Sequence, residues 1–574
     1  MLDYLIKGGT LIDGTGAPGQ LGNIGIKDGR ISAMGDVDDP AHKTIDATGK
    51  IVSPGFVDVH THYDAQVFWD PDISPSSFHG VTSCFAGNCG FSVAPLSPEI
   101  GDYLMRMLAK VEGMPLKSLK NGVPWDWDSF DSYLNKLEGT TAINIGFLVG
   151  HSTIRRLVMG EDSDKAATPE QIEAMKALLK KSIAEGGMGF SSSHAATHND
   201  GDGMPVPSRA ATPEELIELA GCLREYPGTL LEFIPPLGTT GEERAKLMTD
   251  MSLAAQRSLN WNVLIVTRGD QKMIEAQLMA SDYAEERGAV IKALTFAQPV
   301  SLRVNLLSGF AMDSFPGWAP ILALPLEERK KAFSDPEIRK TLVAGASHEK
   351  IPAVLRATGN FEKMLVEQTF SEANAAYEGH MISDLAKELG KSASDVFFDI
   401  AVADDLKTTF LPSLGGHDDE SWALRGKVFK DPRTLVGASD AGAHLDMIDT
   451  FAFSTTLLSE GVRQHQLLSL VEGIYEITEK PARFLGLKER GRLQEGWYAD
   501  IVVFDEATIG KGPIHTRNDL PEGAGRLYCE ALGIQNVIVN GQEIIRNNQL
   551  TGVKAGTVLR SGRDTETVLI PAAM

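Results

Sequence analysis

The middle of the chain alternates short apolar runs with amphipathic segments, and this alternation constrains the fold more than any other feature. Residues 143–150 (INIGFLVG), 187–193, 228–234 and 262–267 are apolar runs, and helical patterns lie between them. Strands of a parallel sheet are buried on both faces, so they read as continuous apolar runs. The pattern therefore predicts a parallel sheet covered by helices.

Two of the predicted helices begin with a capping signal. Thr168 can cap a helix that starts at Pro169, and Gln171 can bond back to it. Thr212 opens the next helix in the same way, with Glu215 in the matching position. At this chain length we predict an α/β fold in which a (β/α)8 TIM barrel is the leading form, with a doubly wound open sheet as the alternative.

The two ends of the chain differ from the middle. Both are rich in short β-prone runs that are broken by glycine turns. We predict one small β-sandwich domain formed by residues 1–55 and 485–574, and a barrel formed by residues 56–484. Residues from about 300 to 395 fit the alternation poorly and are predicted to be a helical insertion.

Charge and composition exclude several classes of partner. The 574 residues carry a formal net charge of −23, and 43% of them are hydrophobic. An acidic surface repels nucleic acid and anionic lipid, so we expect neither as a partner. Four cysteines are too few and too scattered for a disulfide framework, and the N-terminus has no signal-peptide pattern. With no apolar run of membrane-spanning length, a cytoplasmic protein is expected.

The segment from Phe56 to Asp64 carries the sharpest chemical pattern. It contains His60 and His62, and residues two apart in a strand point to the same side. Neutral imidazole is a good ligand for zinc and similar metals. Two histidines can also simply line the polar end of a strand, so the pair alone leaves both interpretations open.

The context of this pair resembles the amidohydrolase superfamily, in particular its N-acyl-D-amino-acid deacylase (D-aminoacylase) branch. Residues 51–62 (IVSPGFVDVHTH) are similar to the first barrel strand, and residues 87–91 (GNCGF) to the second-strand motif. The resemblance implies a metal-dependent hydrolase that cleaves the C–N bond of a small N-acyl amino acid-like amide. Homo-oligomers are common among such proteins. Further similar motifs follow in order at 150–155, 187–191, 438–442, 480–487, 491–502 and 539–541.

The resemblance also implies roles for single residues. Cys89 corresponds to a metal ligand, and Asp440 to the catalytic aspartate beside the metal, which serves as general base and acid. His151 lies in a family-like motif, and we predict that it helps to hold the oxyanion in the pocket. Buried packing for Cys89 and a turn-capping role for Asp440 are the alternatives.

The pattern departs from the branch on the fifth and sixth strands, where its members carry metal-binding histidines. The fifth-strand candidate contains Glu232, and the sixth, residues 264–268, contains Thr267. Glu232 could replace one imidazole as a ligand, or the second metal position could be lost. We favour a single zinc ion over two, because Thr267 is a poor ligand.

Substrate contacts are predicted from loops that follow the barrel strands. His194 and His198 follow the fourth strand, and Arg268 could supply a positive charge. His444 matches a family histidine that is followed by proline and arginine, but here Leu445 and Asp446 follow. That arginine helps to hold the substrate carboxylate in the family, so a free carboxylate on the substrate is in doubt.

The sequence leaves two other functions open. A hydrolase of cyclic amides or lactones would share the metal chemistry. A degenerate barrel relative without catalysis would explain the missing histidines on the fifth and sixth strands.

Overall fold

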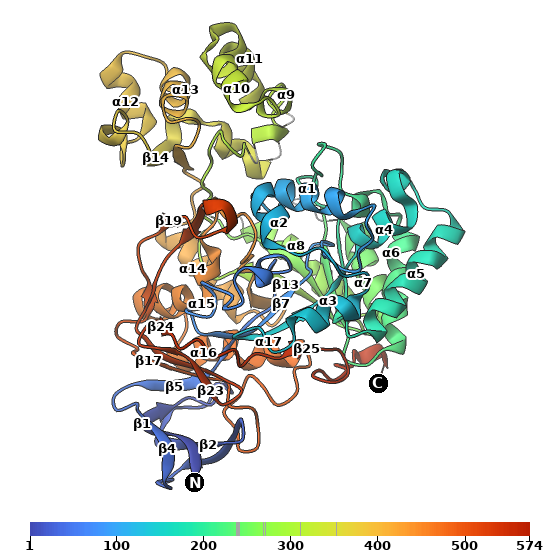
Figure 1. Ribbon diagram of the computed structural model, residues 1–574, viewed down its shortest axis with the longest axis vertical. Helices are drawn as coiled ribbons and strands as arrows, with labels where there is room; N and C mark the ends of the chain where they lie inside the picture. The colour runs from blue at the N-terminus through green and yellow to red at the C-terminus, as the bar shows by residue number, and fades with distance from the viewer. Residues whose placement is uncertain are drawn as a thin grey trace. The chain divides into compact units, whose positions relative to one another are not determined.

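The computed structural model describes residues 1–574 except 237–240, 268, 270, 310, 311, 350, 352 and 574. The chain forms two compact units (Figure 1). The main unit comprises Met1–Pro299, His417–Ala443 and Thr450–Met574. The insertion unit comprises Val300–Gly416 and His444–Asp449.

The main unit is built around two sheets in which every strand pairing is parallel. Their orders are β16-β13-β12-β11-β10-β9 and β25-β8-β7-β6. One residue separates β8 from β9, and Thr61 bridges Ala441 in parallel beyond β6 and β16. The strands are β6 (Phe56–Asp58), β7 (Val81–Ala86), β8 (Asn144–Phe147), β9 (Val149–Gly150), β10 (Gly189–Ser193), β11 (Leu230–Ile234), β12 (Leu259–Leu264), β13 (Ile291–Phe296), β16 (Thr434–Gly437) and β25 (Val558–Leu559).

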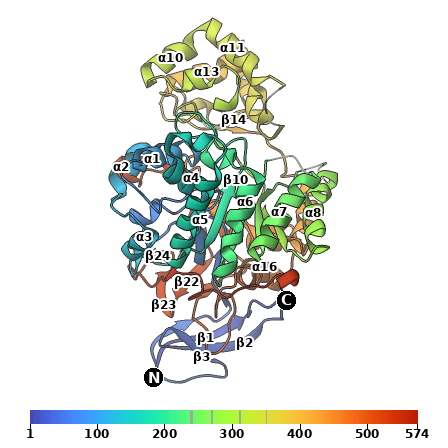
Figure 2. The same ribbon diagram turned by 90° about the vertical axis from the view of Figure 1, so that its right-hand side faces the viewer.

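Helices alternate with these strands along the chain, and several lie side by side in Figure 2. The predicted caps are confirmed: Thr168 Oγ1 accepts from the Gln171 N–H at 3.3 Å, and Thr212 caps its helix through Glu215. The main unit is thus a mixed α/β structure. Its helices are α1 (Gly101–Val111), α2 (Leu116–Gly122), α3 (Phe130–Leu137), α4 (His151–Met159), α5 (Pro169–Ala184), α6 (Pro213–Gly221), α7 (Glu242–Ala255), α8 (Gln271–Glu285), α14 (Asp419–Lys430), α15 (Phe453–Thr456), α16 (Leu470–Ile477) and α17 (Glu479–Phe484).

The predicted sixth strand was misplaced. The sequence indicates an apolar run at 262–267 and a sixth-strand candidate at 264–268, whereas β12 spans Leu259–Leu264. Asn260 and Asn262 interrupt the apolar pattern at the start of β12, although both side chains are buried. The apolar residues that follow Leu264 extend the apolar run of the sequence past the end of the strand. The strand itself contains no histidine.

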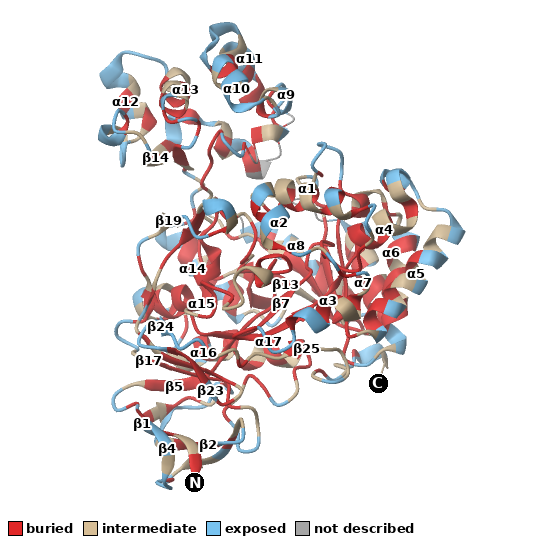
Figure 3. Cartoon of the chain, viewed as in Figure 1, coloured by how far each residue is buried: buried red, intermediate tan, exposed pale blue. Residues whose placement is uncertain are grey.

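Both ends of the chain contribute to one nine-stranded sheet, of order β24-β23-β22-β17-β5-β1-β2-β3 with β4 beside β1. Ile24, Val52, Ile501 and Ile538 pack together in its core. Figure 3 shows how thoroughly the central strands of the main unit are buried. The terminal strands are β1 (Leu2–Leu11), β2 (Gln20–Lys27), β3 (Arg30–Gly35), β4 (Ala41–Asp46), β5 (Ile51–Pro54), β17 (Ile501–Phe504), β22 (Ile534–Val539), β23 (Gln542–Arg546) and β24 (Gln549–Leu550), with short pairs β18 (Gly510–Lys511) with β21 (Ala531–Leu532) and β19 (His515–Arg517) with β20 (Arg526–Tyr528).

The insertion unit is mainly helical and has its own aromatic core. Trp318 is fully buried there with Phe333, Phe361 and Phe398. No helix in the described residues of either unit is long and apolar enough to cross a membrane. The elements are α9 (Ala319–Leu322), α10 (Leu326–Ser334), α11 (Pro336–Ala346), α12 (Ile382–Leu389) and α13 (Ala393–Ala403), with β14 (Met364–Gln368) antiparallel to β15 (Thr409–Pro412).

Candidate metal centre

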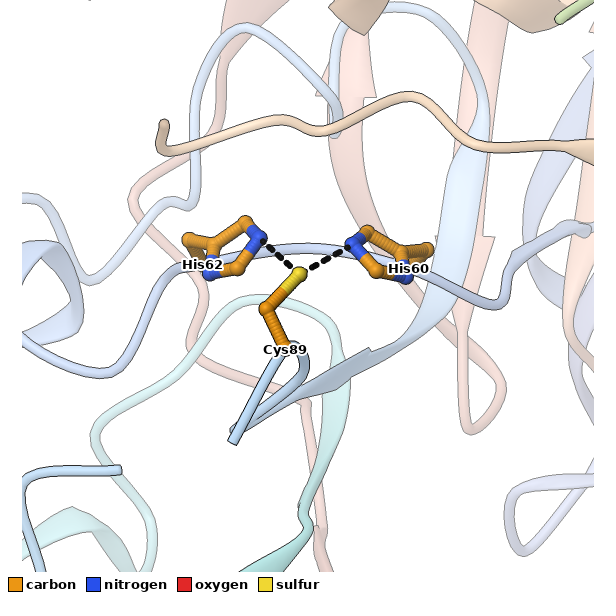
Figure 4. A group of neighbouring side chains, drawn as sticks. All are labelled: His60, His62 and Cys89. Atoms are coloured by element: carbon orange, nitrogen blue, oxygen red, sulfur yellow. Dashed lines mark hydrogen bonds between the residues drawn. The ribbon is translucent and has the colours of Figure 1, made fainter. Parts of the chain in front are cut away.

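Three potential metal ligands converge beyond the ends of β6 and β7 (Figure 4). The Sγ atom of Cys89 lies 3.3 Å from His60 Nε2 and 3.5 Å from His62 Nε2. All three residues are buried, and their ligand atoms lie within 4.8 Å of one another. The structure therefore brings together the residues that the HxH pattern and the GNCGF segment predicted separately.

Asp440 adds a carboxylate to this cluster. Its Oδ1 lies 3.4 Å from His60 Nε2 and 3.1 Å from His62 Nε2. The Asp440 N–H donates to the His60 carbonyl, and the His62 N–H donates to the Ala441 carbonyl. These bonds fix the segment after β16 against the segment after β6. The Asp440 side chain is 22% exposed, compared with 3–4% for the two histidines, so it forms the open side of the cluster.

The backbone at Cys89 is held in the left-handed region. Cys89 has a φ of 59° and lies between Gly87 and Gly90, which have φ values of 76° and 78°. A Cβ on Gly87 would lie 2.2 Å from the Leu148 carbonyl oxygen, so only glycine fits there. The left-handed conformation is costly for a residue with a side chain, and it persists only where its surroundings enforce it.

Glu112, which follows α1, was not found by sequence reasoning. Its Oε1 lies 3.3 Å from Nδ1 of His62, and both side chains are 3% exposed. A carboxylate on one ring nitrogen orients the other nitrogen toward a metal. Glu112 lies outside every recognised motif, and its only sequence signal is its place at the end of an amphipathic helix.

Glu232 lies next to the cluster and is bonded through both of its oxygens. Oε2 accepts from the Cys89 N–H at 2.9 Å, and Oε1 accepts from the Asn262 side-chain amide. Asn262 on β12, rather than Thr267, is thus the sixth-strand residue that faces Glu232. The predicted alternative ligand is close to Cys89, but it contacts the backbone of that residue.

In the described part of the chain, no lysine or arginine acts on the buried carboxylates of Glu112 and Glu232. Burial raises the pKa of Glu232 to about 8 and that of Glu112 to about 7, and it raises the pKa of Cys89. Burial lowers the pKa of His62, but Glu112 and Asp440 outweigh it and raise the pKa to about 9. The groups that act on these side chains in the described residues are imidazoles, amides and other acids. A divalent cation fits, because it would supply the missing charge to nitrogen, sulfur and oxygen donors of the kind that zinc binds.

Comparison with known proteins agrees with this geometry. A model described as the amidohydrolase family matches residues 43–545. The chain belongs to this family. It is 30% identical over 563 residues to D-aminoacylase of Alcaligenes xylosoxydans xylosoxydans, which covers 97% of each chain, and it lies in the D-aminoacylase-like branch.

Two solved structures resemble the whole chain. A structure of D-aminoacylase, described for its binuclear metal centre with one-metal activation and second-metal attenuation, is 26% identical, with a TM-score of 0.64 and coverage of 98% and 100%. The fold is also that of N-acyl-D-glutamate deacylase from Bordetella bronchiseptica, which was solved with zinc and a phosphonate inhibitor. That structure is 24% identical, with a TM-score of 0.65 and coverage of 98% and 100%.

His151 lies in a separate buried network. Its Nε2 is 2.8 Å from Glu215 Oε1, its Nδ1 is 2.9 Å from Ser192 Oγ, and Arg155 also pairs with Glu215. The ring is fully buried, and burial lowers its pKa. A role in holding the oxyanion would require one of these contacts to break, and this role stays a prediction.

The remaining predicted substrate contacts are dispersed. His194 packs edge-on against Phe233, and its Nε2 has no hydrogen-bond partner among the described residues. His198 Nδ1 is 2.8 Å from Ser193 Oγ. His444 belongs to the insertion unit, and Arg268 lies outside the described residues. These roles stay predictions.

Proposed function

We propose that the protein hydrolyses a C–N bond of a small amide, most closely an N-acyl amino acid-like substrate, with one zinc ion. The observation that carries this proposal is the convergence of His60, His62, Cys89 and Asp440, with Asp440 on the open side. Membership of the amidohydrolase family supports it. The D-aminoacylase-like relatives support the choice of substrate class.

The metal would be held by Nε2 of both histidines, Cys89 Sγ and Asp440 Oδ1. A zinc ion there supplies a Lewis acid that polarises a carbonyl oxygen and makes a water molecule more acidic. We favour one ion because both oxygens of Glu232 already accept hydrogen bonds, and Asn262 is a weaker ligand than an imidazole.

The protein's own groups then manage the proton and the geometry. Asp440 accepts a proton from the attacking water and passes it to the leaving nitrogen, as a positioned carboxylate does in general acid–base catalysis. Glu112 holds the His62 ring by its far nitrogen, so that Nε2 faces the cluster. Glu232 holds the left-handed backbone of Cys89.

We propose that the two parallel sheets form one closed (β/α)8 barrel. The strand order β6-β7-β8/β9-β10-β11-β12-β13-β16 follows the chain, and the Thr61–Ala441 bridge joins its first and last strands. The metal centre then lies at the carboxyl ends of the strands, where barrel enzymes place their sites. Residues 1–55 and 485–574 would form the accessory β-domain of this barrel, except for β25, which pairs with β8.

A cyclic amide or lactone is the second candidate substrate. The observation that favours it is Asp446, which is partly buried and accepts from Asn305 Nδ2 at 2.8 Å. Burial raises its pKa, and an acidic side chain cannot pair with a substrate carboxylate. A ring substrate without a free carboxylate needs no cationic side chain to hold it.

Metal content per chain, together with turnover, tests the proposal. We expect about one zinc ion in the wild type and its loss in Cys89→Ala, with free amine released from N-acyl amino acids by the wild type only. Cys84→Ala is the matched control, because Cys84 is also buried but lies outside the ligand cluster. Turnover of ring substrates alone would select the second candidate. No metal, and no activity after zinc is added back, would contradict both.

A further inference from the structure

A cavity of about 390 Å³ lies where the carboxyl ends of β11 and β12 meet α7 and α8. Figure 2 shows these two helices side by side. The walls are mainly apolar, and none of the lining residues belongs to the His60, His62, Cys89 and Asp440 cluster. Its volume is within the range of sites for small molecules. We call this space the α7–α8 cavity.

One cationic side chain lines the cavity without a carboxylate partner. Arg244 is partly buried, and its Nη1 makes only a long contact of 3.4 Å with the Pro236 carbonyl. Within the described part of the chain, no acidic group forms an ion pair with it. Glu242 also lines the cavity and is exposed. A partly buried guanidinium with open donor positions is a receptor for a planar anion such as a carboxylate.

A second polar donor lies deeper in the same cavity. Trp261 is only 4% exposed, and its Nε1 has no hydrogen-bond partner among the described residues. A buried indole N–H normally finds an acceptor, so its lack of one indicates an absent ligand atom. Met279, which is 63% exposed, also lines the cavity, and methionine adapts to apolar ligands of varied shape.

We propose that the α7–α8 cavity binds a carboxylate with a short apolar chain. The carboxylate pairs with Arg244 and accepts from Trp261 Nε1, and the chain lies against Met248 and Ala280. An amine would be repelled by Arg244 and would meet only the exposed carboxylate of Glu242, whereas a neutral alkane or alcohol would leave the guanidinium unpaired. Water alone is a poor occupant, because most of the wall offers it no partner.

The cavity is connected to the metal centre through one residue. Asn262 lines the cavity and donates to Glu232, which in turn accepts from the Cys89 N–H. Asn262, a residue of the cavity wall, therefore lies two hydrogen bonds away from a proposed metal ligand. The ligand could be the acid released by amide hydrolysis, which rests on the proposed function, or a carboxylate from another source. The proposed binding of a carboxylate in the cavity does not depend on which of these two sources supplies it.

Calorimetric titration of the full-length, metal-free protein with octanoate tests the binding. We expect octanoate to bind, octylamine not to bind, and Arg244→Gln to weaken octanoate binding by about 10- to 100-fold, the range of a charge-assisted hydrogen bond. Lys246→Gln, on the same helix and paired with Asp250, is the matched control and should change nothing. Ala280→Trp fills the cavity and should abolish binding.

Three results would overturn the proposal: no octanoate binding, equal binding of octylamine, or unchanged affinity in both Arg244→Gln and Ala280→Trp. Circular dichroism of each variant checks that it is folded. Because the titration needs no metal and no turnover, a failure of the proposed function leaves this result unaffected.

Inhibition of the zinc enzyme by octanoate assigns the source of the ligand. A rise in KM alone, lost in Arg244→Gln, assigns the cavity to the acyl group of the substrate. A fall in kcat, also lost in Arg244→Gln, assigns it to a separate carboxylate that acts through Asn262. Inhibition that persists unchanged in Arg244→Gln would contradict a link between the cavity and the metal centre.

Discussion

The two sides of the metal centre differ in what their side chains can still bind. On the side of β6, β7 and β16, the donor atoms of His60, His62, Cys89 and Asp440 face one another. On the side of β11 and β12, both oxygens of Glu232 accept hydrogen bonds from Cys89 and Asn262. The donor atoms on the side of β6, β7 and β16 can therefore bind a cation. Glu232, on the side of β11 and β12, instead holds the backbone of Cys89 in place.

This difference teaches that a residue's chemical type does not decide its role. Glu232 and Glu112 are both buried carboxylates within contact of a proposed ligand residue. Glu112 contacts a ring nitrogen, whereas Glu232 contacts a backbone N–H. Both therefore act on ligands without being placed among the ligand atoms themselves.

Replacing Asp440, the proposed proton acceptor on the ligand side of the site, should have the largest effect on activity. We expect Asp440→Asn to lower kcat/KM by about 10²- to 10⁴-fold, the usual contribution of a general acid–base group. Steady-state assays of amine release measure it, with the exposed Asp39→Asn as control. Retention of more than a tenth of the activity would show that another group transfers the proton.

Changing the carboxylate behind His62 should have the next largest effect. Glu112→Gln keeps the size of the side chain but removes its charge, so we expect zinc affinity to fall by about 10- to 100-fold. Competition with a chelating dye measures the affinity. Glu138→Gln, an exposed site outside the cluster, is the control. Unchanged affinity would mean that Glu112 only fills space.

Changing Glu232 tests whether the second side is structural. Glu232 accepts hydrogen bonds from the Cys89 N–H and the Asn262 side-chain amide. A glutamine would turn its own NH2 group toward one of these two donors. Glu232→Gln should therefore cost about 1–3 kcal/mol of unfolding free energy while zinc per chain stays the same. Denaturant unfolding and metal analysis measure the two quantities. Loss of one of two zinc ions would instead make Glu232 a ligand and overturn the comparison.

The pH dependence of stability should be a gradual effect, on the order of 1 kcal/mol per pH unit. In metal-free protein the pKa of Glu232 is raised from 4.5 to about 8, so the folded state binds the proton more tightly. The resulting stability is present below pH 4.5 and is lost as the pH rises to about 8. The pKa of His62, raised from 6.5 to about 9, acts in the same direction.

Urea titrations from pH 5 to pH 9 measure this slope. Glu232→Gln cannot titrate, so it should lessen the slope below pH 8 and leave the contributions of Glu112 and His62, whose pKa values are also raised. Zinc should reverse the trend, because the metal competes with the proton on His62 and binds more tightly as the pH rises. A metal-free protein that gains stability toward pH 8 would contradict the assigned shifts.

Local patterns in the sequence predicted much of the ligand side. His60 and His62 are two residues apart after a strand, so their convergence follows from strand geometry. The helix caps at Thr168 and Thr212 are confirmed for the same local reason. The sixth strand was misplaced because β12 contains two buried asparagines, Asn260 and Asn262, which interrupt its apolar pattern.

By itself the sequence determined the family, the alternation of strands and helices, and the candidate ligands that lie within motifs. Only the tertiary structure decided that Glu112 supports His62, and that Glu232 supports Cys89 together with Asn262. The physical reason is distance along the chain. Residues on different strands or helices meet only after folding, and the hydrogen bonds they form there determine whether a carboxylate is left free to bind a metal.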